Sequence, residues 1–104
     1  MVKNKLLPIR WDKFAKEEFK QAISYYKQYS IQGANNVKGD ILQTVSKLNL
    51  FPEKYPLEPH LGEPFRYVTV RDFKIIYYIT SREIRIVDVF NSKQSPTKMT
   101  RIIH

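Results

Sequence analysis

The chain has 104 residues, a formal net charge of +8 and no cysteine. This length indicates one domain around one core, and a hydrophobic fraction of 42% excludes a disordered polycation. The lack of cysteine excludes disulfides, thiolate metal sites and thiol nucleophiles. No run approaches the roughly 18 apolar residues of a membrane span, and no apolar signal-peptide stretch follows the first residues, so we expect a cytoplasmic protein that does not bind membranes.

The N-terminal half predicts a strand and a helical hairpin. Residues 6–11 are apolar but include Pro8, which cannot donate to a sheet, so an edge strand is expected. A helix is predicted from Asp12, as its N-cap, to about residue 30, because apolar residues recur there at helical spacing. Gly33 interrupts the pattern, and a second helix is predicted over residues 34–49. The short connection predicts that the two helices run antiparallel.

The C-terminal half predicts a loop and a three-stranded meander. Residues 51–64 hold four of the six prolines, which excludes a helix or a central strand. Residues 65–70, 73–80 and 84–91 are rich in Val, Ile, Phe and Tyr and predict antiparallel strands. The order β-α-α-β-β-β predicts an α+β fold, in which an N-terminal strand and a two-helix hairpin pack on a small twisted antiparallel sheet. The other sheet face is expected to stay partly open, and a loop and short helix should end the chain.

Alternation along the strands predicts which side chains face the helices. Four residues of the middle strand share one face and are assigned to the core: Phe73, Ile75, Tyr77 and Ile79. Arg66 and Lys74 are expected to share a concave surface. The last strand alternates less regularly around Asp88, and its faces stay unassigned. Residues 65–104 hold eight basic and three acidic side chains, so an anionic partner is expected to meet this half.

Few patterns in the sequence indicate catalysis. His60 and His104 lie far apart, and neither metal-binding nor catalytic-triad spacings occur, so we expect no metal and no cofactor. The three glycines form no phosphate-binding loop. What remains is a set of basic side chains beside aromatic ones on the strands. Nucleic-acid surfaces use this combination, but ordinary solvated strands share it.

Four segments carry a resemblance to a known family: IRWDKFAKEEFKQAISYY, LNLFPEKYPLEP, FRYVTVRDFKIIYYI and IRIVDVFNSKQSP. In the third, an Arg-containing strand and a turn precede a strand that reads aromatic, basic, apolar, apolar, Tyr from Phe73 to Tyr77. Over nearly its whole length, the chain resembles the RelE/ParE superfamily of bacterial type II toxin–antitoxin toxins.

The resemblance implies a small basic toxin whose cognate antitoxin covers a basic groove. RelE-like toxins enter the ribosome and cut mRNA, whereas ParE-like toxins inhibit DNA gyrase and have no known ribonuclease chemistry. By position, the resemblance implies that Arg66, Lys74 and Lys93 are catalytic cations and that Glu63 is a candidate carboxylate base. Further candidates for binding RNA or another target are Arg71, Arg85, Asn91 and Lys98.

The chain also departs from the RelE-like pattern. Asn91 stands where many relatives have His, Lys93 stands where they have Arg, and no Tyr follows Tyr78. Attack by a ribose 2′-OH needs groups that remove and donate protons, together with cations that stabilise the phosphorane. Three interpretations stay open: ribosome-dependent mRNA cleavage, which leads because the basic residues fall near RelE-like positions; gyrase inhibition; and a degenerate, non-toxic module that binds an antitoxin. The oligomeric state also stays open.

Overall fold

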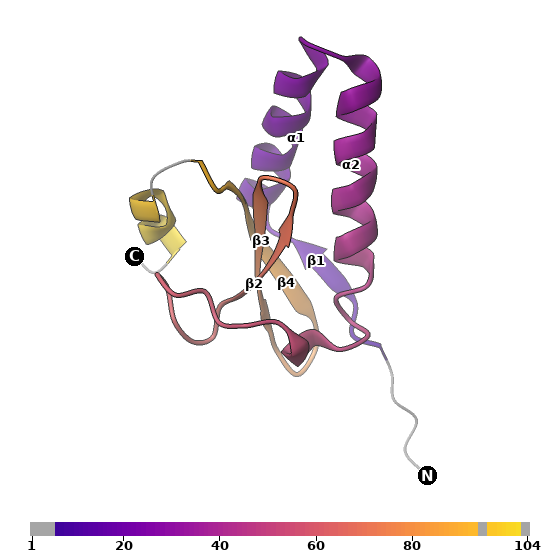
Figure 1. Ribbon diagram of the computed structural model, residues 1–104. Helices are drawn as coiled ribbons and strands as arrows, with labels where there is room; N and C mark the ends of the chain where they lie inside the picture. The colour runs from indigo at the N-terminus through magenta and orange to yellow at the C-terminus, as the bar shows by residue number, and fades with distance from the viewer. Residues whose placement is uncertain (1–5, 94–95, 103–104) are drawn as a thin grey trace.

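The computed structural model describes residues 6–93 and 96–102 and has two layers. The elements follow in the order β1 (Ile9–Trp11), α1 (Lys13–Lys27), α2 (Ile31–Ser46), the 3-10 helix η1 (Pro52–Lys54), β2 (Arg66–Val70), β3 (Phe73–Ile79), β4 (Ile84–Asn91) and the 3-10 helix η2 (Pro96–Ile102). The α1–α2 hairpin covers one face of the sheet and projects beyond its end (Figure 1). This arrangement confirms the predicted α+β fold.

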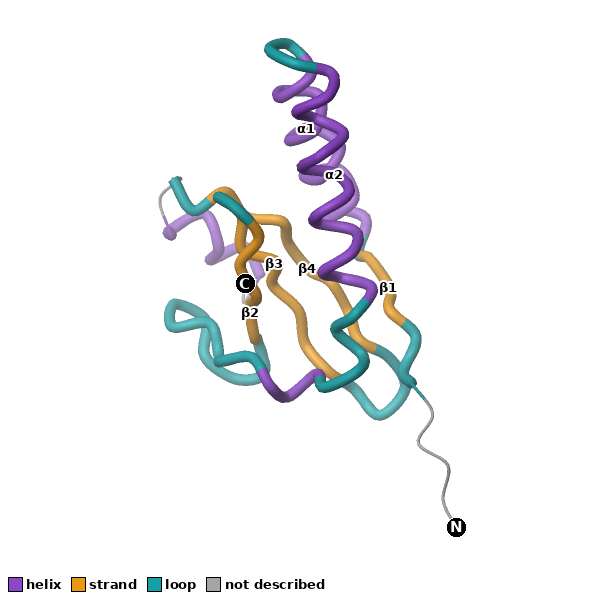
Figure 2. The backbone as a smooth tube through the Cα atoms, turned by 45° about the vertical axis from the view of Figure 1, so that its right-hand side comes forward, coloured by secondary structure: helices purple, strands orange, loops and turns teal. Residues whose placement is uncertain are grey.

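The sheet has the strand order β1-β4-β3-β2, and the backbone trace shows it as a twisted layer beside the hairpin (Figure 2). The pairs β2–β3 and β3–β4 are antiparallel, as predicted. The N-terminal strand adds to the other side of β4 in parallel, with Ile9 opposite Ile84, so the complete sheet is mixed. Pro8 lies just before this edge strand, and its carbonyl accepts a hydrogen bond from the Ile84 amide at 2.9 Å.

The predicted start of the second helix at residue 34 is wrong, because α2 begins at Ile31. Ser30 is its N-cap, and the Ser30 hydroxyl accepts a hydrogen bond from the Gly33 amide at 2.9 Å. Gly33 therefore belongs to the first helical turn and does not end the hairpin connection. Asp12 precedes α1 as predicted, but its side chain does not cap the helix and instead pairs with Arg85.

The main core lies between the hairpin and the sheet. The strand residues assigned to it are confirmed: Phe73, Ile75 and Tyr77 are buried, and Ile79 is half-buried and packs against the same cluster. The Tyr77 hydroxyl donates to the Pro52 carbonyl at 2.6 Å, which ties the loop before β2 to the sheet. Burial of this phenol raises the pKa of Tyr77 to about 12.

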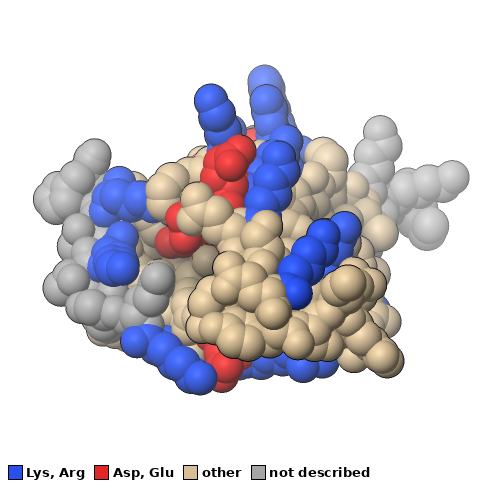
Figure 3. Space-filling view, turned by 90° about the horizontal axis from the view of Figure 1, so that it is seen from above, with Lys and Arg blue, Asp and Glu red and all other residues tan. Residues whose placement is uncertain are grey.

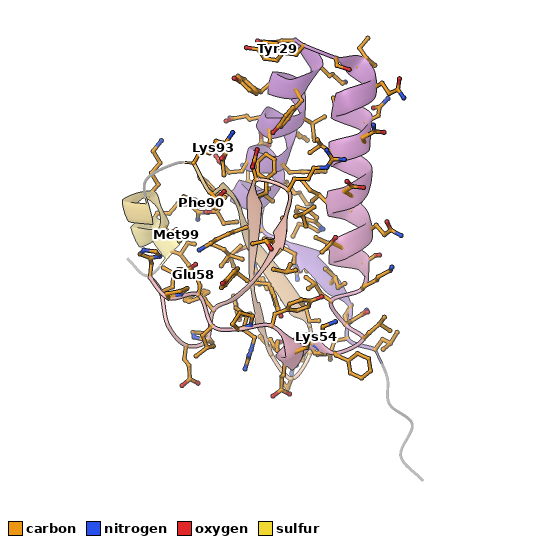
Figure 4. The ribbon with its side chains drawn as sticks, viewed as in Figure 1. Tyr29, Lys54, Glu58, Phe90, Lys93 and Met99 are labelled. Atoms are coloured by element: carbon orange, nitrogen blue, oxygen red, sulfur yellow. The ribbon has the colours of Figure 1, made fainter. Side chains whose placement is uncertain are left out.

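The second sheet face is partly open, as expected, because Thr69 is exposed and Tyr67 and Tyr78 are half-buried, but the rest of this face is covered. Four residues form a second buried cluster there: Ile76, Val87, Phe90 and Met99. Met99 belongs to η2, and the side-chain view shows it next to Phe90 on the side of the sheet away from the hairpin (Figure 4). The C-terminal segment therefore covers apolar surface that the strands alone would leave exposed. Among the described residues, no helix is long and apolar enough to cross a membrane.

A register shift explains the irregular alternation of β4. Ile76 is opposite Asp88 while the next residue, Tyr77, is opposite Ile86, so Val87 is an extra residue on β4. Such a bulge lets two successive side chains take the same face. Val87 thus joins the second cluster, and Asp88 pairs there with Arg101 of η2 at 3.2 Å.

We expect the buried Asp88 carboxyl to make stability depend on pH. Burial raises its pKa to about 6, although the Arg101 charge acts in the opposite direction. Between about pH 4 and pH 6 the folded state keeps a proton that the unfolded state releases, so this contribution to the free energy of unfolding falls by up to about 3 kcal/mol as pH rises. In Asp88→Asn this fall should disappear, so urea unfolding should favour the variant more at pH 7 than at pH 4.5. Equal pH dependence in both proteins would contradict this expectation.

Candidate functional site

The predicted catalytic cation Lys74 lies on the sheet face away from the hairpin. The Lys74 ammonium is 2.7 Å from Oε2 of Glu58, whose side chain is completely buried. It also lies 4.6 Å from the centre of the Tyr67 ring, within the range of a cation–π contact. Only 19% of the Lys74 side chain is exposed. Lys74 is therefore enclosed by a carboxylate and an aromatic ring.

The carboxylate that pairs with Lys74 is held in place by its own loop. Oε1 of Glu58 accepts a hydrogen bond from the His60 amide at 2.6 Å, and Nδ1 of His60 lies 3.1 Å away. Burial acts to raise the pKa of Glu58, but the hydrogen bonds from Lys74 and His60 outweigh it, so the pKa lies below its ordinary value. Glu58 and Lys74 thus form a hydrogen-bonded ion pair at the second sheet face, where Figure 4 labels Glu58.

Sequence reasoning missed Glu58 and selected Glu63 from the same loop. Glu63 is exposed and follows Gly62, which has a positive φ of 70°. It lines a shallow cavity of about 270 Å³ with Arg66. Within the described part of the chain, no hydrogen bond or ion pair joins Glu63 to Lys74. The available signal was physical: a lysine on a half-buried strand needs a counter-charge, and the proline-rich loop holds three glutamates, Glu53, Glu58 and Glu63.

The expectation that Arg66 and Lys74 share a surface is wrong. Arg66 is opposite Tyr77 in the β2–β3 ladder, whereas Lys74 is opposite Thr69, so the two basic side chains fall on different sheet faces. Arg66 donates from Nη1 to the Tyr55 carbonyl at 2.6 Å and to the Glu53 carbonyl at 3.3 Å. Arg66 therefore anchors the proline-rich loop.

Three further predicted residues lie around the turn between β2 and β3. Lys93 is 77% exposed, and its ammonium is 3.5 Å from Asp72. The Lys93 amide donates to the Asn91 side chain at 2.9 Å. Arg71 has a φ of 55° and pairs with Asp40 of α2 at 2.7 Å, which links the turn to the hairpin. This end of the molecule is therefore linked internally by ion pairs and hydrogen bonds.

The last two predicted residues lie elsewhere. Arg85 of β4 pairs with Asp12 and with Glu83, the latter at 3.3 Å. The Asp12 contact, more than its other neighbours, raises the pKa of Arg85 above its ordinary value. Lys98 is exposed on η2 and forms no ion pair with a residue that the structure describes.

The comparisons with known proteins identify the family. A family model described as the ParE toxin of the type II toxin–antitoxin system parDE matches residues 9–96. The chain belongs to the ParE toxin family. Among solved structures, it is similar to a chain of the chromosomal ParDE system from P. aeruginosa, with 17% identity and a TM-score of 0.73, covering 83% of this chain and 96% of that one. No curated protein matches the sequence.

In this ParE family member, the cations predicted as catalytic do not converge. Lys74 lies on the second sheet face, Arg66 on the hairpin face, and Lys93 at the β2–β3 end. Lys74 and Lys93 are each paired with a carboxylate, and Arg66 donates to backbone carbonyls. Within the described residues, no group of three or more His, Asp or Glu side chains is placed to hold a metal ion. The arrangement supplies internal ion pairs and loop anchors.

Proposed function

We propose that this chain is the toxin of a type II toxin–antitoxin pair, that a cognate antitoxin neutralises it, and that it acts by inhibiting DNA gyrase. Its membership of the ParE family, matched over residues 9–96, supports this proposal. The superfamily resemblance implies gyrase as the target of ParE-like members. RelE-like action on ribosome-bound mRNA is the competing mechanism.

The observation that carries the choice between these mechanisms is the Lys74–Glu58 ion pair. A lysine serves as a general base only in its neutral form, which requires surroundings that disfavour the charge. Here the Lys74 ammonium donates at 2.7 Å to the buried Glu58 carboxylate, so the side chain is held against a partner within the protein. The ion pair therefore supports a mechanism that needs no base at this position.

The test measures gyrase inhibition with the purified protein and mRNA cleavage in cells that express it. We expect the toxin to inhibit supercoiling of relaxed plasmid by gyrase, and induced cells to show no codon-positioned mRNA cuts by primer extension. The double variant Glu58→Gln, Lys74→Met removes both charges while keeping similar volume, and such a replacement of a buried pair is often neutral for folding. It should inhibit gyrase as strongly as the original chain.

Two results would contradict the proposed mechanism. The first is normal supercoiling at toxin concentrations that arrest growth. The second is mRNA cleavage that the double variant abolishes, which would assign Lys74 to a nuclease site. Unaffected growth on induction, together with tight binding of the product of an adjacent gene, would indicate the non-toxic module.

The proposed antitoxin has its own test. Co-expression of the neighbouring short reading frame should restore growth, and the two products should co-purify as a complex. Restored growth without a complex would contradict direct neutralisation.

A further inference from the structure

The hairpin carries positive charge that the described carboxylates do not neutralise. Six basic side chains elsewhere form ion pairs: Arg10, Arg71, Lys74, Arg85, Lys93 and Arg101. Five exposed lysines of the hairpin form no ion pair with any described residue, and we call them the lysine stripe: Lys13, Lys16, Lys20, Lys27 and Lys38. Seen from above, several Lys and Arg side chains project from one side of the molecule, with acidic side chains between them (Figure 3).

The four stripe lysines of α1 share one side of the helix. At about 100° of rotation per residue, they fall within an arc of about 60°. With a rise of about 1.5 Å per residue, they extend over about 21 Å along the helix. Glu17 and Glu18 fall outside this arc. Lys13, Lys16 and Lys20 follow one another at spacings of three and four residues, Lys27 lies two turns further along, and the exposed Glu17 flanks this row.

The second helix extends this surface across a groove. A cavity of about 320 Å³ is lined by Lys20 and Lys27 of α1 and by Lys38 of α2. Its other lining residues are Phe19, Ile23 and Ser24, and no acidic side chain lines it. Lysines thus face the same groove from both helices.

We propose that the lysine stripe binds the phosphate backbone of duplex DNA. The inference rests on the proposed function in one respect, because gyrase acts on DNA and a toxin on the enzyme–DNA complex can contact both. A row of about 21 Å lies alongside about six base pairs, since successive phosphates of one strand advance about 3.4 Å along the axis. The stripe thus faces several phosphates at once.

Lysine suits a contact with phosphates at varied positions, because it is a point charge on a flexible stem. Lysine also pairs with carboxylates in this chain, as Lys74 does with Glu58 and Lys93 does with Asp72. An acidic protein segment is therefore the competing occupant, and the experiment distinguishes it from DNA.

The experiment measures binding of the purified chain to a fluorescent 30-base-pair duplex at several salt concentrations. Each phosphate contact contributes about 0.9 to the slope of log affinity against log salt, so five contacts predict a slope of about −4.5. Replacing Lys20 and Lys27 by glutamine should reduce the magnitude of this slope by about 1.8 and weaken binding at 0.1 M salt at least about tenfold. Circular dichroism checks that the variant is folded.

The matched control replaces Lys47 and Lys54 by glutamine, which changes the net charge equally. Both are exposed and form no ion pair with a described residue, and Figure 4 shows Lys54 at the opposite end of the molecule from Tyr29 of the hairpin tip. The control should keep the original slope. Equal loss in both variants would overturn the proposal, because binding would then follow net charge alone. Absence of DNA binding, with stripe-dependent binding of polyglutamate, would overturn it in favour of an acidic protein segment.

Gyrase inhibition is measured on the same proteins to separate this inference from the proposed function. Inhibited supercoiling without any DNA binding by the toxin would refute the lysine stripe and leave the proposed function intact. Stripe-dependent DNA binding with normal supercoiling would refute the gyrase mechanism and leave the stripe as a DNA-binding surface.

Discussion

Replacing Glu58 by alanine should lower the free energy of unfolding by about 3–5 kcal/mol, measured by urea denaturation near pH 7. The substitution leaves the Lys74 ammonium, with only 19% of its side chain exposed, without its counter-charge. It also removes the acceptor of the His60 amide hydrogen bond. Removing one member of a buried pair costs more than the pair itself contributes, because the remaining charge stays desolvated.

Two variants separate this effect from a general sensitivity of the loop. Glu63→Ala changes an exposed glutamate of the same loop and should alter stability by no more than about 0.5 kcal/mol. The double variant Glu58→Gln, Lys74→Met should recover most of the loss, because no unpaired charge remains. Equal stability of the Glu58 and Glu63 alanine variants would contradict the buried ion pair.

Replacing Met99 by alanine should cost about 2–5 kcal/mol. Met99 is 1% exposed and packs with Ile76, Val87 and Phe90, so its truncation leaves a cavity over the second sheet face. Thermal unfolding followed by circular dichroism measures the loss. Hydrogen exchange should also show faster exchange of backbone amides in η2 and β4, because both elements contribute side chains to this cluster.

The neighbouring Lys98 provides the matched control for Met99. Its side chain is exposed on the same 3-10 helix, so Lys98→Ala should change stability by no more than about 0.5 kcal/mol. Met99→Leu conserves volume and should cost less than about 1.5 kcal/mol. If all three variants have the same thermal stability, packing of the C-terminal segment on the second sheet face does not stabilise the fold.

Periodicity predicted the elements well because it reports local burial. The helical repeat of α1 and the alternation of Phe73, Ile75 and Tyr77 each show which side faces apolar neighbours. The start of α2 was predicted less well, because Gly33 was interpreted as a helix breaker. In the structure its amide donates to the Ser30 cap, so Gly33 lies in the first turn. The bulge at Val87 appeared in the sequence only as irregular alternation, and this left the faces of β4 unassigned because alternation assumes a continuous ladder.

The site was harder to predict than the fold because charges pair across the chain. Glu58 and Lys74 are 16 residues apart, and Arg71 and Asp40 are 31 apart, so no spacing rule connects them. Arg66 and Lys74 were assigned to one surface from separate strands, but faces match only through the register between strands.

By itself, the sequence determined the element order, the core-facing residues of β3, the absence of cysteine chemistry and an excess of eight positive charges. Composition and periodicity suffice for these properties because they depend on residue type and on near neighbours. Only the tertiary structure decided which basic side chains have partners within the protein. It pairs most basic side chains of the C-terminal half with carboxylates or carbonyls and leaves the hairpin lysines unpaired among the described residues. The physical reason is that neutralising a charge requires a partner a few ångströms away, and folding alone brings such partners together.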